Sequence, residues 1–351
     1  MSAQTPACQL LERQDSDFRD WLWVAAPRDD WWLSSDRQRR VWGHDTGIVN
    51  AAREAGHRVS HAVSFADARA DDTIAQAAGA IVFWPKAHAL GEWWLVALCQ
   101  VLPAGTPIKV VGEVNGGIKR AERILKALGM TARKDDTARR CQLWSSATRE
   151  LTAEQAASSE SPLAVAGQWT EGWGEFEALE MRLTSHPGLY GNAKLDPGTA
   201  LLLENLPTRG YKRALDIGAG DGIISCWLAR HGARVMAGDV SAFAVEATRR
   251  SLALNGLEAD VRLSDVFAAF EGERFEAIVA NPPFHHERDI DYGPAARLIS
   301  QAPDHLMPGG TLTLVANAFL PYPDLLQAAF GEFEVLAETR QFKVYRARKA
   351  R

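Results

Sequence analysis

One short segment, an apolar strand that ends in an acid and enters a glycine-rich turn, constrains the fold of this chain most strongly. Residues 213–217 read as a buried strand with Asp216 near its end, and an apolar helix follows the turn. The turn has glycine at alternate positions, namely Gly218, Gly220 and Gly222. Glycine allows left-handed backbone, and a helix N-terminus offers free N–H groups. A carboxylate there would repel a pyrophosphate but suits an ammonium group, so we expect a ligand that carries an amino acid and no phosphate.

Two further strands end in acids. Asp239 follows an apolar strand and lies 23 positions after Asp216, a distance at which a strand-end acid accepts the hydroxyls of a bound ribose. Asp265 ends the next strand, where it suits the amino group of an adenine. We assign Val240 and Val266, which follow these acids, to the same cofactor site. Ligands of open α/β sheets bind at the carboxyl ends of the strands, so these side chains are expected to gather there.

A fourth strand, residues 275–280, runs into Asn281, Pro282, Pro283 and Phe284. The prolines cannot continue a strand ladder, because each lacks an N–H and has a fixed φ. The result is a rigid corner that displays an amide, carbonyl oxygens and an aromatic ring, which together suit a planar ring bearing an amino group. Taken alone, the same residues are equally consistent with a stiff turn.

Length and composition set the class of protein. A chain of 351 residues is expected to form two domains, and we place them at 1–165 and 166–351, on either side of a polar stretch between residues 151 and 168. The net charge of −5 excludes a globally basic nucleic-acid binder, although not a local basic patch. The sequence shows no membrane span, no signal peptide and no metal-type cysteine spacing, which favours a cytoplasmic location.

The first half alternates strands, turns and helices but lacks a glycine turn followed by a strand-end acid. It therefore reads as a structural α/β domain, with its many tryptophans as packing residues. Its basic cluster could contact a phosphate backbone or form a solvated face balanced by Asp135 and Asp136, and we slightly favour the face. The cluster comprises Arg133, Lys134, Arg139 and Arg140.

The order of these motifs resembles a class I methyltransferase that uses S-adenosylmethionine (SAM), and more closely the RsmC family, which methylates guanine N2 in 16S ribosomal RNA. The resemblance covers nearly all of residues 185–348. It rests on residues 281–285, 239–247, 315–323 and 342–347, and more weakly on 83–86, 111–113 and 138–141. It implies two tandem Rossmann-like α/β domains, a C-terminal one with a seven-stranded SAM-binding sheet and an N-terminal one that has lost its site. The sequence departs from the family pattern at Tyr190, 194–198 and 286–289.

The resemblance also assigns roles. Asn281, Pro282, Pro283 and Phe284 would be catalytic, and Phe284, His285 and Asn317 would contact the base. The partner would be ribosomal RNA within the small subunit, the cofactor SAM, and the protein a monomer without a metal. Alternatives stay open at this point. They are a guanine-N2 methyltransferase of 23S ribosomal RNA and a non-catalytic assembly factor that kept the fold. The tetrapeptide also occurs in adenine-N6 methyltransferases and in enzymes that act on a glutamine amide of release factors.

Overall fold

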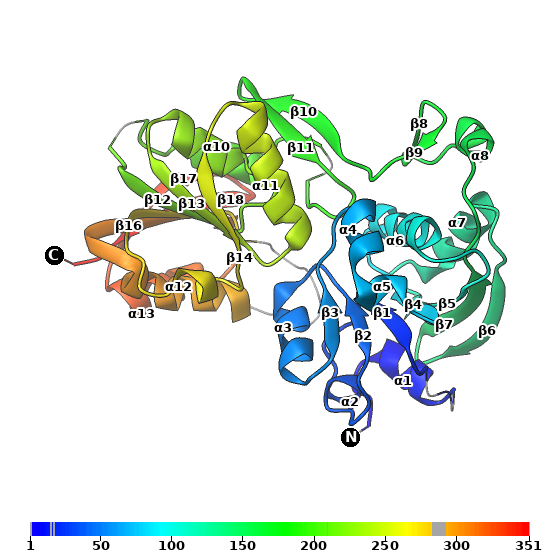
Figure 1. Ribbon diagram of the computed structural model, residues 1–351. Helices are drawn as coiled ribbons and strands as arrows, with labels where there is room; N and C mark the ends of the chain where they lie inside the picture. Colours follow the sequence, from blue (N-terminus) through cyan, green and yellow to red (C-terminus); the bar gives the residue numbers. More distant parts are fainter. Residues whose placement is uncertain are drawn as a thin grey trace. The chain divides into compact units, whose positions relative to one another are not determined.

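The computed structural model describes residues 2–14, 16, 18–191, 193–208, 210–282 and 293–350. The chain divides into two compact units, Met1–Trp173 and Gly174–Arg351 (Figure 1). Each unit contains a seven-stranded mixed sheet covered by helices.

The first unit has the strand order β3-β2-β1-β4-β5-β7-β6, in which β7 pairs antiparallel with both β5 and β6 and the other neighbouring strands pair parallel. The strands are β1 (Trp21–Val24), β2 (Arg40–Trp42), β3 (Arg58–Ser60), β4 (Gly79–Phe83), β5 (Pro107–Glu113), β6 (Arg133–Ala138) and β7 (Cys141–Ala147). The helices are α1 (Pro6–Glu12), α2 (Asp30–Leu33), α3 (Thr46–Glu54), α4 (Phe65–Ala70), α5 (Asp72–Ala75), α6 (His88–Val101), the 3-10 turn η1 (Ile118–Arg120), α7 (Ala121–Ala127) and α8 (Ala153–Ser158). A small hairpin, β8 (Ala164–Val165) and β9 (Gln168–Trp169), closes the unit.

The second unit begins with the hairpin β10 (Gly174–Ala178) and β11 (Met181–Ser185). Its large sheet contains β12 (Arg213–Ile217), β13 (Arg234–Asp239), β14 (Ala259–Leu263), β15 (Phe275–Ala280), β16 (Leu306–Asn317), β17 (Phe333–Glu338) and β18 (Phe342–Arg348). Its helical elements are α9 (Pro197–Glu204), α10 (Ile223–Arg230), α11 (Ala242–Leu254), the 3-10 turn η2 (Ala268–Phe270), α12 (Gly293–His305) and α13 (Tyr322–Phe330).

The two large sheets have the same topology, since the order β14-β13-β12-β15-β16-β18-β17 repeats that of the first unit strand for strand. In the second unit the order reverses between β12 and β15, which is the switch point where α/β sheets bind ligands. Figure 1 shows α10 and α11 on one face of this sheet and α12 and α13 on the other. Alternate strand residues pack into these two layers, as expected for a sheet buried on both faces.

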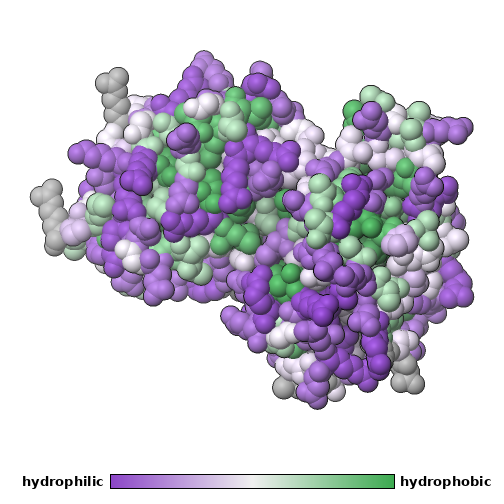
Figure 2. Space-filling view, in the orientation of Figure 1, coloured by the Kyte–Doolittle hydropathy of each residue, from purple (hydrophilic) through white to green (hydrophobic). Residues whose placement is uncertain are grey.

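The tryptophans of the first unit are packing residues, as the sequence indicates. Trp32, Trp93 and Trp94 are fully buried, and Trp93 and Trp94 meet edge to face with ring centroids 4.8 Å apart. On the face drawn in Figure 2, hydrophilic residues cover most of the surface of each unit. Within the described residues, no helix is both long and apolar enough to span a membrane.

Two expectations from the sequence need revision. The polar stretch 151–168 contains α8 and the β8–β9 hairpin, because Thr152 caps the helix by accepting from Gln155 N–H. Strand β14 ends at Leu263, so Asp265 lies two residues beyond it, in the loop toward η2.

Candidate active site

The predicted site residues meet at one edge of the second sheet. Strand register places Ile217 opposite Gly238 on β13 and opposite Ala280 on β15. The next residues along these strands, Gly218, Asp239 and Asn281, therefore lie side by side at the carboxyl edge, as the sequence predicts.

The three glycines of the turn serve different purposes. All have left-handed φ values, 80° at Gly218, 57° at Gly220 and 87° at Gly222. A Cβ on Gly218 or Gly220 would come no nearer than 3.9 Å to an atom of another described residue beyond its chain neighbours, so these residues border open space beside the loop. A Cβ on Gly222 would lie 2.8 Å from the Cα of Thr248, so this glycine lets α10 and α11 approach closely.

Asp216 is buried beneath the loop rather than displayed at its surface. Its Oδ2 accepts a hydrogen bond from Ser225 Oγ on α10 at 2.6 Å, while its buried Oδ1 has no partner among the described residues. Burial raises the pKa of this carboxyl to about 7, and the nearby charges of Asp239 and Asp221 raise it further. A cationic group reaching Oδ1 would remove that penalty.

Asp239 connects two strand-end loops. Its Oδ2 accepts from the Gly220 N–H at 3.0 Å, and its Oδ1 accepts from the Ser241 N–H at 2.8 Å. The acid therefore holds the glycine turn in register with the end of β13, beside the half-exposed side chain of Val240.

Asp265 is already engaged by a cation. The guanidinium of Arg297 on α12 donates to both carboxylate oxygens, at 2.7 and 3.0 Å. Val266 adopts a left-handed φ of 51°, which is costly for a β-branched residue. Ser264 holds this turn, because its hydroxyl donates to Val266 O at 2.8 Å and accepts from Ala269 N–H at 3.0 Å.

Asn281 directly follows β15, as predicted, and its side chain is anchored at one end. Its Nδ2 donates to Asp196 Oδ2 at 3.0 Å and to Thr199 Oγ1 at 2.7 Å. No hydrogen bond from another described residue reaches its Oδ1. Pro282 is buried behind it.

The other base-contacting candidates are only partly described. Asn317 ends β16 opposite Phe342, and its carbonyl accepts from Leu320 N–H at 3.0 Å. Pro283, Phe284 and His285, like the divergent 286–289 stretch, lie outside the described residues. Their assignments therefore stay predictions.

Four residues at this edge of the sheet were not predicted from the sequence to belong to the site: Asp196, Thr199, Ser225 and Arg297. Asp196 did carry a signal, since an acid followed by proline marks a helix start, but that signal indicates a cap and not a contact with Asn281. Ser225 and Arg297 reach Asp216 and Asp265 through the packing of helices against the sheet, which no local sequence pattern indicates.

The residues fit SAM, a cation that carries an ammonium and a sulfonium group. Burial raises the pKa of Asp221 to about 6, and the charge of Asp196 adds to the shift. Asp216, Asp221 and Asp239 thus form a group of acids beside an open glycine turn, with one buried carboxylate oxygen left unsatisfied. Among the described residues, no cluster of three or more metal-ligating side chains occurs.

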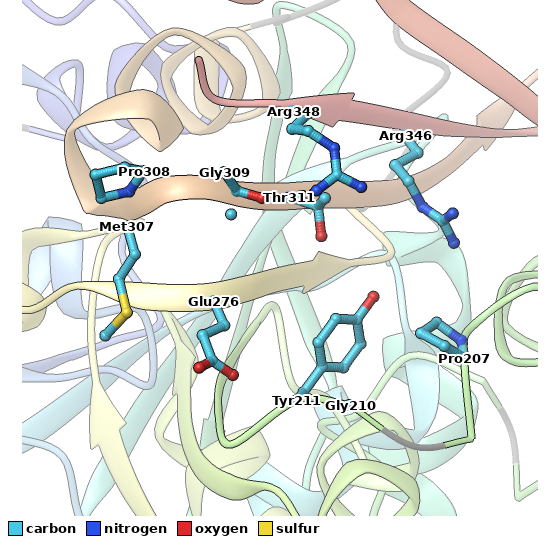
Figure 3. Close-up of a pocket in the computed structure, with 11 residues that line it drawn as sticks. Pro207, Gly210, Tyr211, Glu276, Met307, Pro308, Gly309, Thr311, Arg346 and Arg348 are labelled. Carbon is cyan, nitrogen blue, oxygen red and sulfur yellow. Dashed lines mark hydrogen bonds between the residues drawn. The ribbon is translucent and has the colours of Figure 1, made fainter. Parts of the chain in front are cut away.

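A cavity of about 360 Å³ lies elsewhere in the same unit (Figure 3). It is lined by residues at the start of β15 and β16 and at the end of β18, including Glu276, Thr311, Arg346 and Arg348. Arg346 donates to Asn205 O at 3.3 Å and Arg348 to Gly309 O at 2.9 Å, so both arginines tie the strand to neighbouring loops. None of the strand-end site residues lines this cavity.

Comparison with known proteins identifies the family. The model of the methyltransferase small domain matches residues 180–346, and the model of its N-terminal domain matches residues 8–159. The ribosomal RNA small subunit methyltransferase C of Chromohalobacter salexigens is 52% identical over 355 residues, covering 100% of both chains. This chain belongs to the RsmC family.

Other RsmC relatives agree in length and structure. The small subunit methyltransferase C of Escherichia fergusonii is 36% identical and is matched over 99% of this chain and 97% of its own. The solved 16S rRNA N2 methyltransferase RsmC of T. Thermophilus, in complex with AdoMet and guanosine, gives a TM-score of 0.82 at 26% identity, covering 99% of this chain and 92% of that one. The two-domain Rossmann-like fold is thereby confirmed.

In the first unit of this RsmC-family chain, the residue that follows the strand at the switch point differs from Asn281 of the second unit. Trp84 follows β4 as Asn281 follows β15, and its indole Nε1 donates to His88 Nδ1 at 3.3 Å. A Cβ on Gly91 would lie 2.8 Å from this indole, so the ring fills the corner. Strand β1 continues into Ala25 and Ala26 without an acid.

Proposed function

We propose that this chain transfers a methyl group from SAM to the exocyclic N2 of a guanine in 16S ribosomal RNA. The observation that carries the proposal is the Asn281 amide, which is anchored through its nitrogen beside the open glycine turn. The names of the RsmC relatives and the guanosine complex of the solved T. Thermophilus protein support the same reaction.

In this proposal the glycine turn and the acids hold the cofactor. Asp216, Gly218 and Gly220 bind the amino acid part, and Asp239 binds the ribose. Gly222, the third glycine assigned to this site, contributes by letting α10 approach α11 so that the turn keeps its shape. Asp265 accepts from the adenine amino group, with Val240 and Val266 as apolar neighbours of the ring. When bound, SAM supplies an electrophilic methyl group.

The chain activates the amine by positioning it. An exocyclic guanine amine is a poor nucleophile, because its lone pair is delocalised into the ring. The Asn281 Oδ1 and the Pro282 carbonyl accept its two hydrogens, which favours a pyramidal nitrogen with a directed lone pair. Alignment and stabilisation of developing positive charge then lower the barrier, and no strong base is needed before attack.

The base must leave its stack before it can reach this corner, at a cost of about a few kcal/mol. Phe284 stacks on the extruded ring, with Pro283 stiffening the turn and His285 and Asn317 shaping the pocket. A 23S substrate is disfavoured, because the relatives reported above are small-subunit enzymes. A purely non-catalytic role is disfavoured by the intact set of acids and by Asn281.

The first unit has a supporting role in this proposal, positioning RNA without binding SAM. Its basic cluster separates into two pairs. Arg133 forms an ion pair with Asp135 at 3.0 Å, and the Lys134 ammonium lies 4.8 Å from the Trp144 ring centroid. Arg139 and Arg140 form the exposed tip of the β6–β7 hairpin, with left-handed φ values of 52° and 59° and no ion pair to another described residue. These two are the better candidates for phosphate contacts.

The reaction is tested with purified chain and radiolabelled SAM on 30S subunits, 50S subunits and free ribosomal RNA. We expect label only in 16S RNA, recovered after nuclease digestion as N2-methylguanosine. Label in 23S RNA, at another atom, or nowhere would overturn the proposal. We further propose that the chain acts as a cytoplasmic monomer, which sedimentation and cell fractionation would check.

A further inference from the structure

The start of helix α9 makes direct contact with the catalytic amide. Asp196 is the N-cap of α9, and its Oδ2 accepts from the Thr199 N–H at 2.8 Å. The same oxygen accepts from Asn281 Nδ2, and Thr199 Oγ1 accepts from that nitrogen as well. Asn281 lies 85 and 82 residues away from these partners in the chain, so the contact is tertiary.

The chemistry of these partners determines which end of the amide faces them. An ionised carboxylate can only accept hydrogen bonds, whereas an amide has one donor end and one acceptor end. A reversed Asn281 amide would lose its bond to Asp196 and set its oxygen against that carboxylate. Thr199 could then bond the amide oxygen only by turning away the hydroxyl proton that it now donates to Asp196. The anchored orientation therefore directs Oδ1 away from α9.

We propose that Asp196 and Thr199 are positioning residues that orient Asn281 so that its amide oxygen, and not its nitrogen, meets the target. This inference rests on the proposed function, because it names the source of the geometry that the methyl transfer needs. It also bears on specificity. An amide oxygen accepts from an exocyclic amine but repels a ring carbonyl placed at the same point, so the pair selects amino-bearing bases.

The local packing suits such a role. Thr199 is 5% exposed and Pro197 begins the helix, so the hydroxyl has little freedom to move. Its Oγ1 also donates weakly to Asp196 Oδ2 at 3.3 Å, which leaves its lone pairs for Asn281.

A matched pair of variants at residue 199 separates positioning from structure. Thr199→Val keeps the shape and removes the hydroxyl, whereas Thr199→Ser keeps the hydroxyl. We expect Thr199→Val to lower kcat by at least about tenfold with an unchanged Kd for SAM, and Thr199→Ser to restore kcat to within about threefold of wild type.

Variants of Asp196 give a second, independent comparison. Asp196→Ser keeps an N-cap acceptor and so preserves the helix, but its shorter side chain no longer reaches Asn281. We expect kcat to fall by at least about tenfold while the melting temperature changes little. Wild-type kcat in both Thr199→Val and Asp196→Ser would overturn the inference, as would losses of kcat that simply follow the melting temperature.

A readout that does not depend on activity keeps this test apart from the proposed function. In protein labelled with 15N-asparagine, the side-chain NH₂ of Asn281, assigned by its loss in Asn281→Ala, should exchange slowly in wild type and rapidly in Thr199→Val. Slow exchange in an enzyme that does not label 16S RNA would refute the proposed function and leave the orientation standing. Equal exchange in wild type and Thr199→Val would refute the orientation whatever the activity.

Discussion

The carboxylate of Asp239 accepts a hydrogen bond from the backbone N–H of Gly220 at 3.0 Å. One acid thus fixes the glycine turn that follows a neighbouring strand, as well as its own loop through Ser241. The two loops at this edge of the sheet are consequently connected, and the loss of Asp239 would remove the hydrogen bonds that hold both of them.

Replacing Asp239 with alanine should weaken SAM binding by about 10- to 100-fold, because a charged hydrogen-bond acceptor and the tie to Gly220 are both lost. Isothermal titration calorimetry measures this directly. Asp260→Ala is the matched control, since Asp260 is an acid of the same sheet that pairs with Arg262 away from the site. An unchanged Kd for Asp239→Ala would remove its assigned role.

Gly220→Ala should weaken SAM binding, because the added Cβ projects into the open space beside the turn. The left-handed φ of 57° also makes alanine unfavourable there by about 1 kcal/mol. Gly232→Ala carries the same kind of strain, with φ 89° and no atom within 4 Å of the new Cβ. Both variants should lower the melting temperature, but only Gly220→Ala should change the Kd.

The pH dependence of SAM binding should report the buried acids. With a pKa of about 7 for Asp216 and about 6 for Asp221, both are partly protonated in weakly acidic solution. A cation favours their ionised forms, so binding releases protons and affinity rises from about pH 5.5 to about pH 7.5. Asp216→Asn should flatten this dependence, and an identical slope in wild type and variant would contradict the assignment.

Stability of the ligand-free protein should show the opposite trend from the same groups. The pKa of Asp216 is higher in the folded chain than its ordinary value. The folded state therefore binds more protons than the unfolded state at pH values between the ordinary pKa and about 7. Its contribution to stability is therefore present at low pH and is lost as pH rises toward about 7. The difference in melting temperature between wild type and Asp216→Asn, followed against pH, isolates this contribution.

The first unit should bind no SAM. Wild type should titrate with one equivalent of SAM per chain. Trp84→Ala should destabilise the protein by about 3–5 kcal/mol, as expected for a buried tryptophan, without adding a second equivalent. A stoichiometry of two in either protein would contradict the interpretation of this unit as degenerate.

Strand ends could be located from the sequence wherever the strand was apolar and stopped abruptly. Strand β15 occurs over the range predicted, because the prolines that follow Asn281 cannot continue the strand ladder. Strand β14 was harder to delimit, since its exposed polar residues give no sharp boundary, and Asp265 belongs to the loop beyond it.

Side-chain partners could not be predicted in the same way. The sequence indicates that Asp216, Asp239 and Asn281 share an edge, because parallel strands of one sheet end together. It does not indicate that Ser225 occupies one oxygen of Asp216 or that Arg297 holds Asp265, since those contacts depend on how helices pack against the sheet.

Single-turnover methylation of 30S subunits by Asn281→Ala separates an action of this amide on the target amine from a role in cofactor binding. We expect transfer of label to 16S RNA to fall to background while the calorimetric Kd for SAM stays within about twofold of wild type, because the amide acts on the target amine and not on the cofactor. Label transfer at the wild-type rate with the same Kd would contradict this expectation.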